Sequence, residues 1–426
     1  MLYKAHKSSL LSASAVYLFS NILAAAIPFA LLPILTRYLT PAEYGQVGIF
    51  QTLLSALGAF VGLSSQGAAG VKYYDANLSR QELKYYIGNC FLVLAMTTAL
   101  VVACAFAFWD VLAGWLAIDT KWIMLSIFVS AAAFVVSMRM EQWQVRKQAK
   151  NYGAFQVIQA LLSMLLSLLL VVCFLQGAAG RVWVLSGIPL VFSVIALFLL
   201  NKDGLLGFAW RPGYLREILA FGVPLIPHSV GLFLLASVDR FVINAKLGLD
   251  QVGVYMVAVQ LVAVMGLVFD AINNAFVPWL FERLKRDDLS EKRQIVRWTY
   301  GYCLSLLAVV PLAFVIGPSL LVLIAGEKYR AAGEVVGLLA LGQAFNGMYL
   351  MVTNYIFYSK RTGLLSVATI CSGLSNVGLL LLLIASMGIK GAALAFAISM
   401  ALKFLLTWFV AHLRHPMPWF NFRTNH

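Results

Sequence analysis

Long apolar blocks follow one another along almost the whole sequence, and they restrict the fold more than any other feature. Each block is long enough to cross a hydrocarbon core of roughly 30 Å as a helix that rises about 1.5 Å per residue. Of the 426 residues, 62% are hydrophobic and only 11% are charged, which excludes a soluble domain of this size. The sequence therefore predicts an all-α polytopic membrane protein with twelve transmembrane helices. The predicted spans are 12–35, 46–70, 85–108, 122–138, 154–176, 182–200, 215–238, 251–279, 297–325, 334–358, 363–387 and 391–413.

The distribution of lysine and arginine predicts the orientation in the membrane. Of 31 such residues, 22 fall on the side that carries both termini in a twelve-span topology, eight fall on the other side, and Lys403 lies within a span. Because cytoplasmic loops are enriched in these residues, both termini are expected in the cytoplasm. The first apolar run continues to Leu35, so it is expected to be a retained helix rather than a cleaved signal peptide.

Several classes of function are disfavoured by what the sequence contains. The net charge of +14 is mostly topological bias, and no clustered basic domain indicates a nucleic-acid partner. No GxxxxGK[ST] or GxGxxG motif is present, and no loop exceeds about 20 residues, so a nucleotide-driven engine is not expected. The five cysteines all fall in predicted spans without CxxC spacing, and we expect no metal site and no bound cofactor apart from a transported H⁺ or Na⁺.

The loop 201–214 lies near the midpoint and separates six spans from six spans. We therefore expect two six-helix bundles, 1–205 and 206–426. The halves resemble each other weakly: Arg37 with Tyr38 corresponds to Arg240 with Phe241, and Gly45 corresponds to Gly253, with five more residues between them in the second copy. Both copies start from a cytoplasmic helix end, so the expected repeat is parallel, although a chance match is the alternative.

Two segments carry a resemblance to a known family. They are SNILAAAIPFALLPILTRYLTPAEYG near the N-terminus, and FGVPLIPHS followed by DRFVI and GVY in the second half. With the span count and topology, these resemble the Wzx-type O-antigen and oligosaccharide flippases, which are polysaccharide transporters of the MATE/MOP superfamily. The resemblance implies a MATE-like fold and translocation of undecaprenyl-diphosphate-linked oligosaccharide from the cytoplasmic to the periplasmic leaflet of a bacterial inner membrane. It also implies membrane lipids, a polysaccharide polymerase and a chain-length regulator as candidate partners.

Three ionisable residues lie deep in predicted spans, where a charge is costly and usually faces a bundle interior or a watery cavity. Asp270 is a candidate for coupling to H⁺ or Na⁺, and the alternative is a core acid that joins helices. Lys403 is a candidate ligand of the diphosphate, and the alternative is a salt bridge with Asp270. His228, which follows Pro227, is a candidate proton relay, or else a hydrogen-bonded core histidine.

Neutral polar residues at helical spacing are candidates to bind the glycan, because sugars need many hydrogen bonds and an aromatic face. Asn273 and Asn274 share one helix face with Asp270. Helix-to-helix hydrogen bonding is the alternative for all of these residues. The further candidates are Tyr17, Asn21, Asn346, Tyr349 and Asn354.

Arg37, Asp239 and Arg240 fall at the predicted periplasmic ends of spans one and seven. We expect them to act as gate or latch residues, or as interfacial anchors, rather than as substrate ligands.

The leading interpretation is a flippase that works by alternating access, coupled to H⁺ or Na⁺, and not an enzyme. A MATE-like multidrug or cation antiporter has the same topology and is the nearest alternative. An integral-membrane polysaccharide polymerase or acyltransferase is less compatible, because such enzymes need catalytic residues near one membrane surface and the predicted periplasmic loops are short. A structural scaffold would not need charges at mid-membrane.

Overall fold

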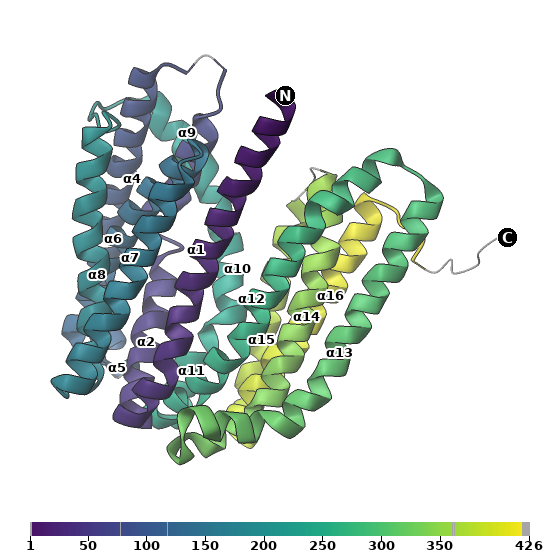
Figure 1. Ribbon diagram of the computed structural model, residues 1–426. Helices are drawn as coiled ribbons and strands as arrows, with labels where there is room; N and C mark the ends of the chain where they lie inside the picture. Colours follow the sequence, from purple (N-terminus) through teal and green to yellow (C-terminus); the bar gives the residue numbers. More distant parts are fainter. Residues whose placement is uncertain (1, 77, 117, 360, 362, 420–426) are drawn as a thin grey trace. The chain divides into compact units, whose positions relative to one another are not determined.

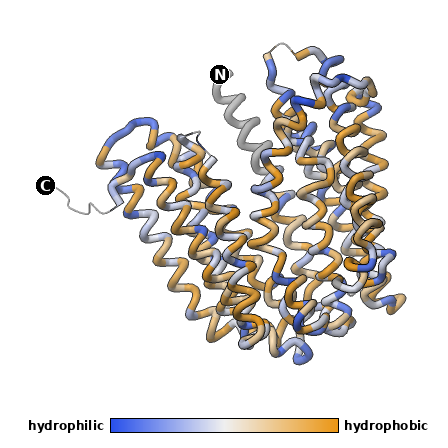
Figure 2. Tube along the Cα trace, turned by 180° about the vertical axis from the view of Figure 1, so that it is seen from behind, coloured by the Kyte–Doolittle hydropathy of each residue, from blue (hydrophilic) through white to orange (hydrophobic). Residues whose placement is uncertain are grey.

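The computed structural model describes residues 2–76, 78–116, 118–359, 361 and 363–419, and of these the side chains from residue 16 onward except residues 18 and 115. In this part of the chain every regular element is helical. Figure 1 shows the order of the helices, and Figure 2 shows that hydrophobic residues run along them while hydrophilic residues gather toward their ends. The chain divides into two compact units, Met1–Ser229 and Val230–His426.

In the first unit, α6 packs against α2, α4 and α8, and α1 packs along α7. Its apolar core lies between α4, α6 and α8 and includes Ile87, Met138 and Ala196. The elements are α1 (Leu2–Tyr38), α2 (Pro41–Leu57), η1 (Val61–Ser64), α3 (Ser65–Lys72), α4 (Arg80–Ala107), α5 (Trp109–Leu116), α6 (Thr120–Val145), α7 (Ala149–Leu168), η2 (Leu169–Cys173), α8 (Gly177–Lys202), α9 (Pro212–Gly222) and η3 (Val223–Leu225).

In the second unit, α14 packs against α12, α13 and α16, and α15 packs on α16. The chain enters this unit through α10, which begins in the first unit. The elements are α10 (Ile226–Ala236), α11 (Val238–Leu247), α12 (Leu249–Arg286), α13 (Leu289–Ala325), η4 (Glu327–Ala332), α14 (Gly333–Tyr358), α15 (Gly363–Met387) and α16 (Ile389–Arg414).

The predicted number of spans is confirmed with one refinement. Among the described residues, 11 helical segments are long and apolar enough to cross a membrane, and the pair Pro41–Leu57 and Val61–Lys72, bent by 56°, brings the number to 12. The second span is therefore broken rather than continuous. The seventh span is also interrupted: Pro224 lies in the 3-10 turn η3 and Pro227 at the start of α10, where a missing N–H loosens the helix.

The division into units lies later along the chain than the expected boundary at 205/206. Asn89, in the third turn of α4, holds the segment that follows α8: its Nδ2 donates to the Ala209 carbonyl (2.9 Å), and the Arg211 backbone N–H donates to its Oδ1 (3.3 Å). Arg139 forms an ion pair with Asp203 (2.5 Å) in the same segment. Together with the packing of α9 on α3 and α4, these bonds keep the start of the seventh span in the first unit.

The weak internal repeat does not hold at its arginines. Arg37 is exposed in the last turn of the continuous helix α1. Arg240 is buried in the first turn of α11, after a break in the helix at Ser237. The five additional residues of the second copy allow this separate helix to form before α12. Gly45 and Gly253 do correspond, because each is buried near the start of the following long helix.

We predict that Asn89→Ala lowers the thermal stability of the protein, because it leaves the Ala209 carbonyl and the Arg211 N–H without their side-chain partner. Asn89 is fully buried, so the expected cost is about 1–3 kcal/mol. Thermal unfolding in detergent measures the effect, and limited proteolysis between α8 and α9 should become faster. The exposed Asn201 provides the matched control, Asn201→Ala. Equal stability of both variants and the wild type would contradict this role.

Candidate functional site

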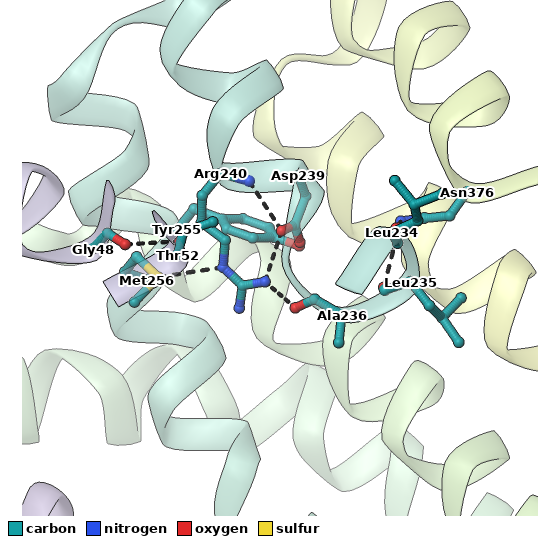
Figure 3. Close-up of polar contacts among 10 residues, drawn as sticks. All are labelled: Gly48, Thr52, Leu234, Leu235, Ala236, Asp239, Arg240, Tyr255, Met256 and Asn376. Atoms are coloured by element: carbon teal, nitrogen blue, oxygen red, sulfur yellow. Dashed lines mark hydrogen bonds and ion pairs between the residues drawn. The ribbon is translucent and has the colours of Figure 1, made fainter. Parts of the chain in front are cut away.

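The helix breaks at Ser237, between α10 and α11, and two charged residues just after the break are buried in the second unit. Asp239 is 3% exposed and Arg240 is 8% exposed. Arg240 Nη1 donates to Asp239 Oδ1 (2.7 Å) and also to the Ala236 carbonyl, and the Tyr255 hydroxyl donates to Asp239 Oδ2 (2.7 Å) (Figure 3). Both carboxylate oxygens are therefore occupied, as a buried charge requires.

The burial of Asp239 and Arg240 disagrees with the alternative in which they are interfacial anchors, while their role as gate or latch residues stays a prediction. The sequence places them at the end of an apolar block, but the backbone turns at Ser237 and begins a new helix. Asp239 then lies in the first turn of α11, where the helix dipole favours a negative charge. Arg37, the third residue of that group, is exposed at the end of α1.

Lys403 is the most deeply buried candidate cation of the second unit. It lies within α16, is 4% exposed, and has Ser399 and Thr407 one turn away on either side. Its Nζ lies 3.6 Å from the centroid of the Tyr349 ring, which is a cation–π contact with α14. The ring's negative face partly compensates the charge where water is excluded.

The predicted alternative, a salt bridge between Lys403 and Asp270, is wrong for this conformation. Among the described residues Lys403 forms no ion pair, although its charge and that of Asp270 interact electrostatically. Asp270 itself is exposed on α12, one residue after the buried Phe269. The two side chains therefore form no salt bridge in this structure.

Arg240 and Lys403 line the same cavity, which has a volume of about 370 Å³ and lies within the second unit. Three charged residues line the cavity: the cations Arg240 and Lys403, and Asp239, which is paired with Arg240. The cavity thus has one positive charge in excess, which an anionic ligand would complement. Its polar lining consists of Asp239, Arg240, Tyr255, Gln343, Asn346 and Lys403.

The predicted asparagines separate into two groups. Asn346 lines the cavity, and its Nδ2 lies 3.5 Å from Gln343 Oε1. Asn354 instead donates to Asn273 Oδ1 (2.8 Å) and joins α14 to α12, and Asn274 is exposed. The geometry of Asn273 and Asn354 fits helix-to-helix bonding, the alternative weighed for them from the sequence.

The remaining candidates lie in the first unit. Tyr17 on α1 makes an edge-to-face contact with Tyr152 on α7, with 5.0 Å between the ring centroids. Asn21 is exposed on α1, and His228 is half-buried in α10. None of these three lines the cavity of the second unit.

Two lining residues, Tyr255 and Gln343, were not among the residues selected from the sequence. Each had a signal. Tyr255 ends the GVY motif that carries part of the family resemblance, and Gln343 lies three residues before Asn346 in an apolar helix. Tyr349 was selected as a glycan ligand; it contacts Lys403 in this structure, and its role toward a sugar stays a prediction.

Comparison with known proteins agrees with this architecture. The model of the polysaccharide biosynthesis protein family matches residues 10–284, which is more than half of the chain. This chain belongs to the polysaccharide biosynthesis protein family. It is 22% identical over 417 residues to a probable low-salt glycan biosynthesis flippase of Haloferax volcanii, covering 93% of this chain and 82% of the relative.

Two solved structures of other proteins are similar to this chain in fold. An inward-facing multidrug resistance MATE transporter of the MOP superfamily has a TM-score of 0.72 and 14% identity, covering 92% of this chain and 94% of that chain. The lipid II flippase MurJ in an inward closed conformation has a TM-score of 0.71 and 14% identity, covering 94% and 87%. The fold expected from the sequence resemblance is confirmed, and the chain is a multi-pass membrane protein.

We predict that Tyr255→Phe destabilises the protein by about 1–3 kcal/mol, because Asp239 Oδ2 would lose its hydroxyl donor inside the second unit. Tyr302→Phe is the matched control, since that buried hydroxyl has no hydrogen-bond partner among the described residues. Thermal unfolding of the two variants in detergent compares the costs. The same cost for both, or none for Tyr255→Phe, would refute the assigned hydrogen bond.

Proposed function

We propose that the chain is a flippase for undecaprenyl-diphosphate-linked oligosaccharide repeat units of O-antigen or exopolysaccharide. In this proposal it moves them from the cytoplasmic to the periplasmic leaflet of a bacterial inner membrane by alternating access. Membership of the polysaccharide biosynthesis protein family supports a role with glycans. The description of a relative as a glycan biosynthesis flippase and the fold shared with a lipid II flippase favour a lipid-linked substrate. A polysaccharide polymerase and a chain-length regulator would be the partners that use the delivered units.

The observation that carries the proposal is the excess positive charge of the cavity in the second unit. Burying a cation among apolar helices is expensive and is seldom retained without a role. Arg240 presents a planar guanidinium held by Asp239, and Lys403 presents a point charge on the ring of Tyr349. A diphosphate supplies the negative charge that Lys403, which has no ion pair among the described residues, would attract, and its oxygens can also accept from Arg240.

The net positive charge of the cavity also disfavours the nearest alternative, an antiporter of cationic drugs. A MATE-like antiporter of cationic drugs needs a cavity that attracts cations, and two buried cations against one engaged acid would repel them. Asn346 and Gln343 add neutral donors and acceptors that suit a sugar or a phosphate. Lys403 and Asp270 also lie within the candidate spans α16 and α12, whereas a polymerase or an acyltransferase needs catalytic residues near a membrane surface.

We predict that Lys403→Gln lowers transport of a fluorescent lipid-linked oligosaccharide in proteoliposomes by about tenfold or more. Loss of one charge-assisted contact of about 1.5–3 kcal/mol gives this magnitude. Lys390→Gln is the matched control, because Lys390 is on the same helix but is exposed and paired with Glu334 (2.9 Å). Wild-type transport by Lys403→Gln, with normal protein levels, would contradict the site.

We further propose that Asp270 couples transport to H⁺ or Na⁺. Its carboxylate interacts electrostatically with Lys403 without forming a salt bridge, so binding or release of an ion at Asp270 would change how strongly Lys403 attracts a diphosphate. His228, beside Pro227 in α10, is the second candidate for proton transfer.

Asp270→Asn should therefore abolish the dependence of transport on an imposed pH or Na⁺ gradient. Asp250→Asn is the matched control, because Asp250 is exposed in the first turn of the same helix. The measurement is the transport rate with and without each gradient. Retained gradient dependence in Asp270→Asn would exclude this residue as the coupling site, and His228→Gln would then be tested in the same assay.

A further inference from the structure

A second cavity, of about 210 Å³, lies entirely within the first unit beside the break in the second span. Ser64 and Gln66 line it from the broken helix, Ser130 and Ser137 from α6, and Pro189 from α8. Among the described residues that line it, no side chain is charged. Its volume corresponds to about seven water molecules, so it has room for far more than a single bound water.

The break that forms this cavity is an unusual piece of backbone. Gly62, Leu63 and Ser64 all have left-handed φ angles of 77°, 50° and 52°. Two of these three residues carry side chains that disfavour that conformation, and such strain persists where the surrounding structure enforces it. The Gly62 N–H donates to Thr97 Oγ1 on α4 (3.0 Å), which holds the open segment in place.

An aromatic ring closes one side of the cavity at Gly62. Phe134 lines the cavity and packs so tightly on this glycine that a methyl group there would lie 2.3 Å from Phe134 Cδ2. The ring also makes an edge-to-face contact with Phe91 on α4, with centroids 6.3 Å apart. Phe134 is therefore fixed between α4 and the broken span.

Two polar side chains that line the cavity, Ser130 and Gln66, can each offer an acceptor oxygen. Ser130 uses its hydroxyl hydrogen on the Ser126 carbonyl (2.8 Å), which leaves its oxygen lone pairs for another donor. Gln66 Oε1 is buried and has no hydrogen-bond partner among the described residues. Acceptors without charge, next to a fixed aromatic ring, match a group that carries several O–H donors and an apolar face.

We propose that this cavity binds one sugar residue of the glycan and is a specificity subsite of the first unit. The inference rests on the proposed function, because it assigns the sugar to the broken second span and the diphosphate to the second unit. Hydroxyl groups of the sugar form hydrogen bonds with the side-chain amide of Gln66 and with Ser130 Oγ, and its C–H face packs on Phe134.

The experiment compares two lipids that differ only in the glycan: undecaprenyl diphosphate and the undecaprenyl-diphosphate-linked oligosaccharide extracted from the cells. Affinities are measured for the purified protein in nanodiscs. Ser130→Ala and Gln66→Leu should each weaken binding of the glycan lipid about tenfold, and leave binding of undecaprenyl diphosphate unchanged. Ala133→Leu, which fills the cavity without removing a polar group, should act in the same way.

Ser193→Ala is the matched control, because this buried serine of α8 bonds the Leu190 carbonyl and does not line the cavity. Unchanged affinity for the glycan lipid in the three cavity variants, or an equal loss for both lipids, would overturn the subsite.

If the wild type binds neither lipid, the proposed function fails, and free methyl hexosides at millimolar concentration then decide the subsite. A rise in the melting temperature of the wild type that Ser130→Ala lacks would keep the sugar site without the flippase. If the melting temperature of the wild type does not rise, the sugar site is refuted together with the flippase function.

Discussion

Placing Lys403 inside an apolar helical bundle is the constraint on which the second unit depends. An ammonium group there loses its hydration, and the structure offers it the ring of Tyr349 rather than a carboxylate. Its charge is therefore moderated but not neutralised. The contact joins α14 to α16, so this pair of side chains contributes both to the packing of these helices and to the charge of the cavity.

Arg240 and Asp239, unlike Lys403, form an ion pair in which each charge balances the other. Their pairing is complete within a few residues and is extended by the Tyr255 hydroxyl, which leaves the guanidinium at the cavity with its counter-charge already engaged. The net positive charge of the cavity therefore comes from Lys403, because the charge of Arg240 is balanced by Asp239. The first unit has the opposite character: the cavity at its broken second span is lined by neutral polar and apolar side chains. A substrate with a charged diphosphate and a neutral glycan needs both kinds of surface.

The parts of this structure that were predictable are those governed by composition along the chain. Span number follows from the length of apolar blocks, and Lys403 was evident because a charge interrupts such a block.

The breaks in the helices were harder to predict from the sequence. The turn at Ser237 lies where an apolar block ends, so Arg240 looked like an interfacial residue, and only tertiary packing shows that α11 turns it inward. The break at residues 58–64 contains no proline, and Gly62 alone does not reveal that Leu63 and Ser64 adopt left-handed conformations. The division between the units was also displaced, because hydrogen bonds of Asn89, which is distant in sequence, decide where the segment after α8 belongs.

The claim that the second unit holds a site for the diphosphate is tested most directly by binding lipids that differ only in headgroup charge. Undecaprenyl diphosphate, undecaprenyl phosphate and undecaprenol would be titrated against the wild-type protein in nanodiscs made of neutral lipid. The cavity geometry predicts that affinity falls in that order, and that the difference shrinks as salt is raised, because the attraction is partly electrostatic. Equal affinities for the three lipids would contradict the account.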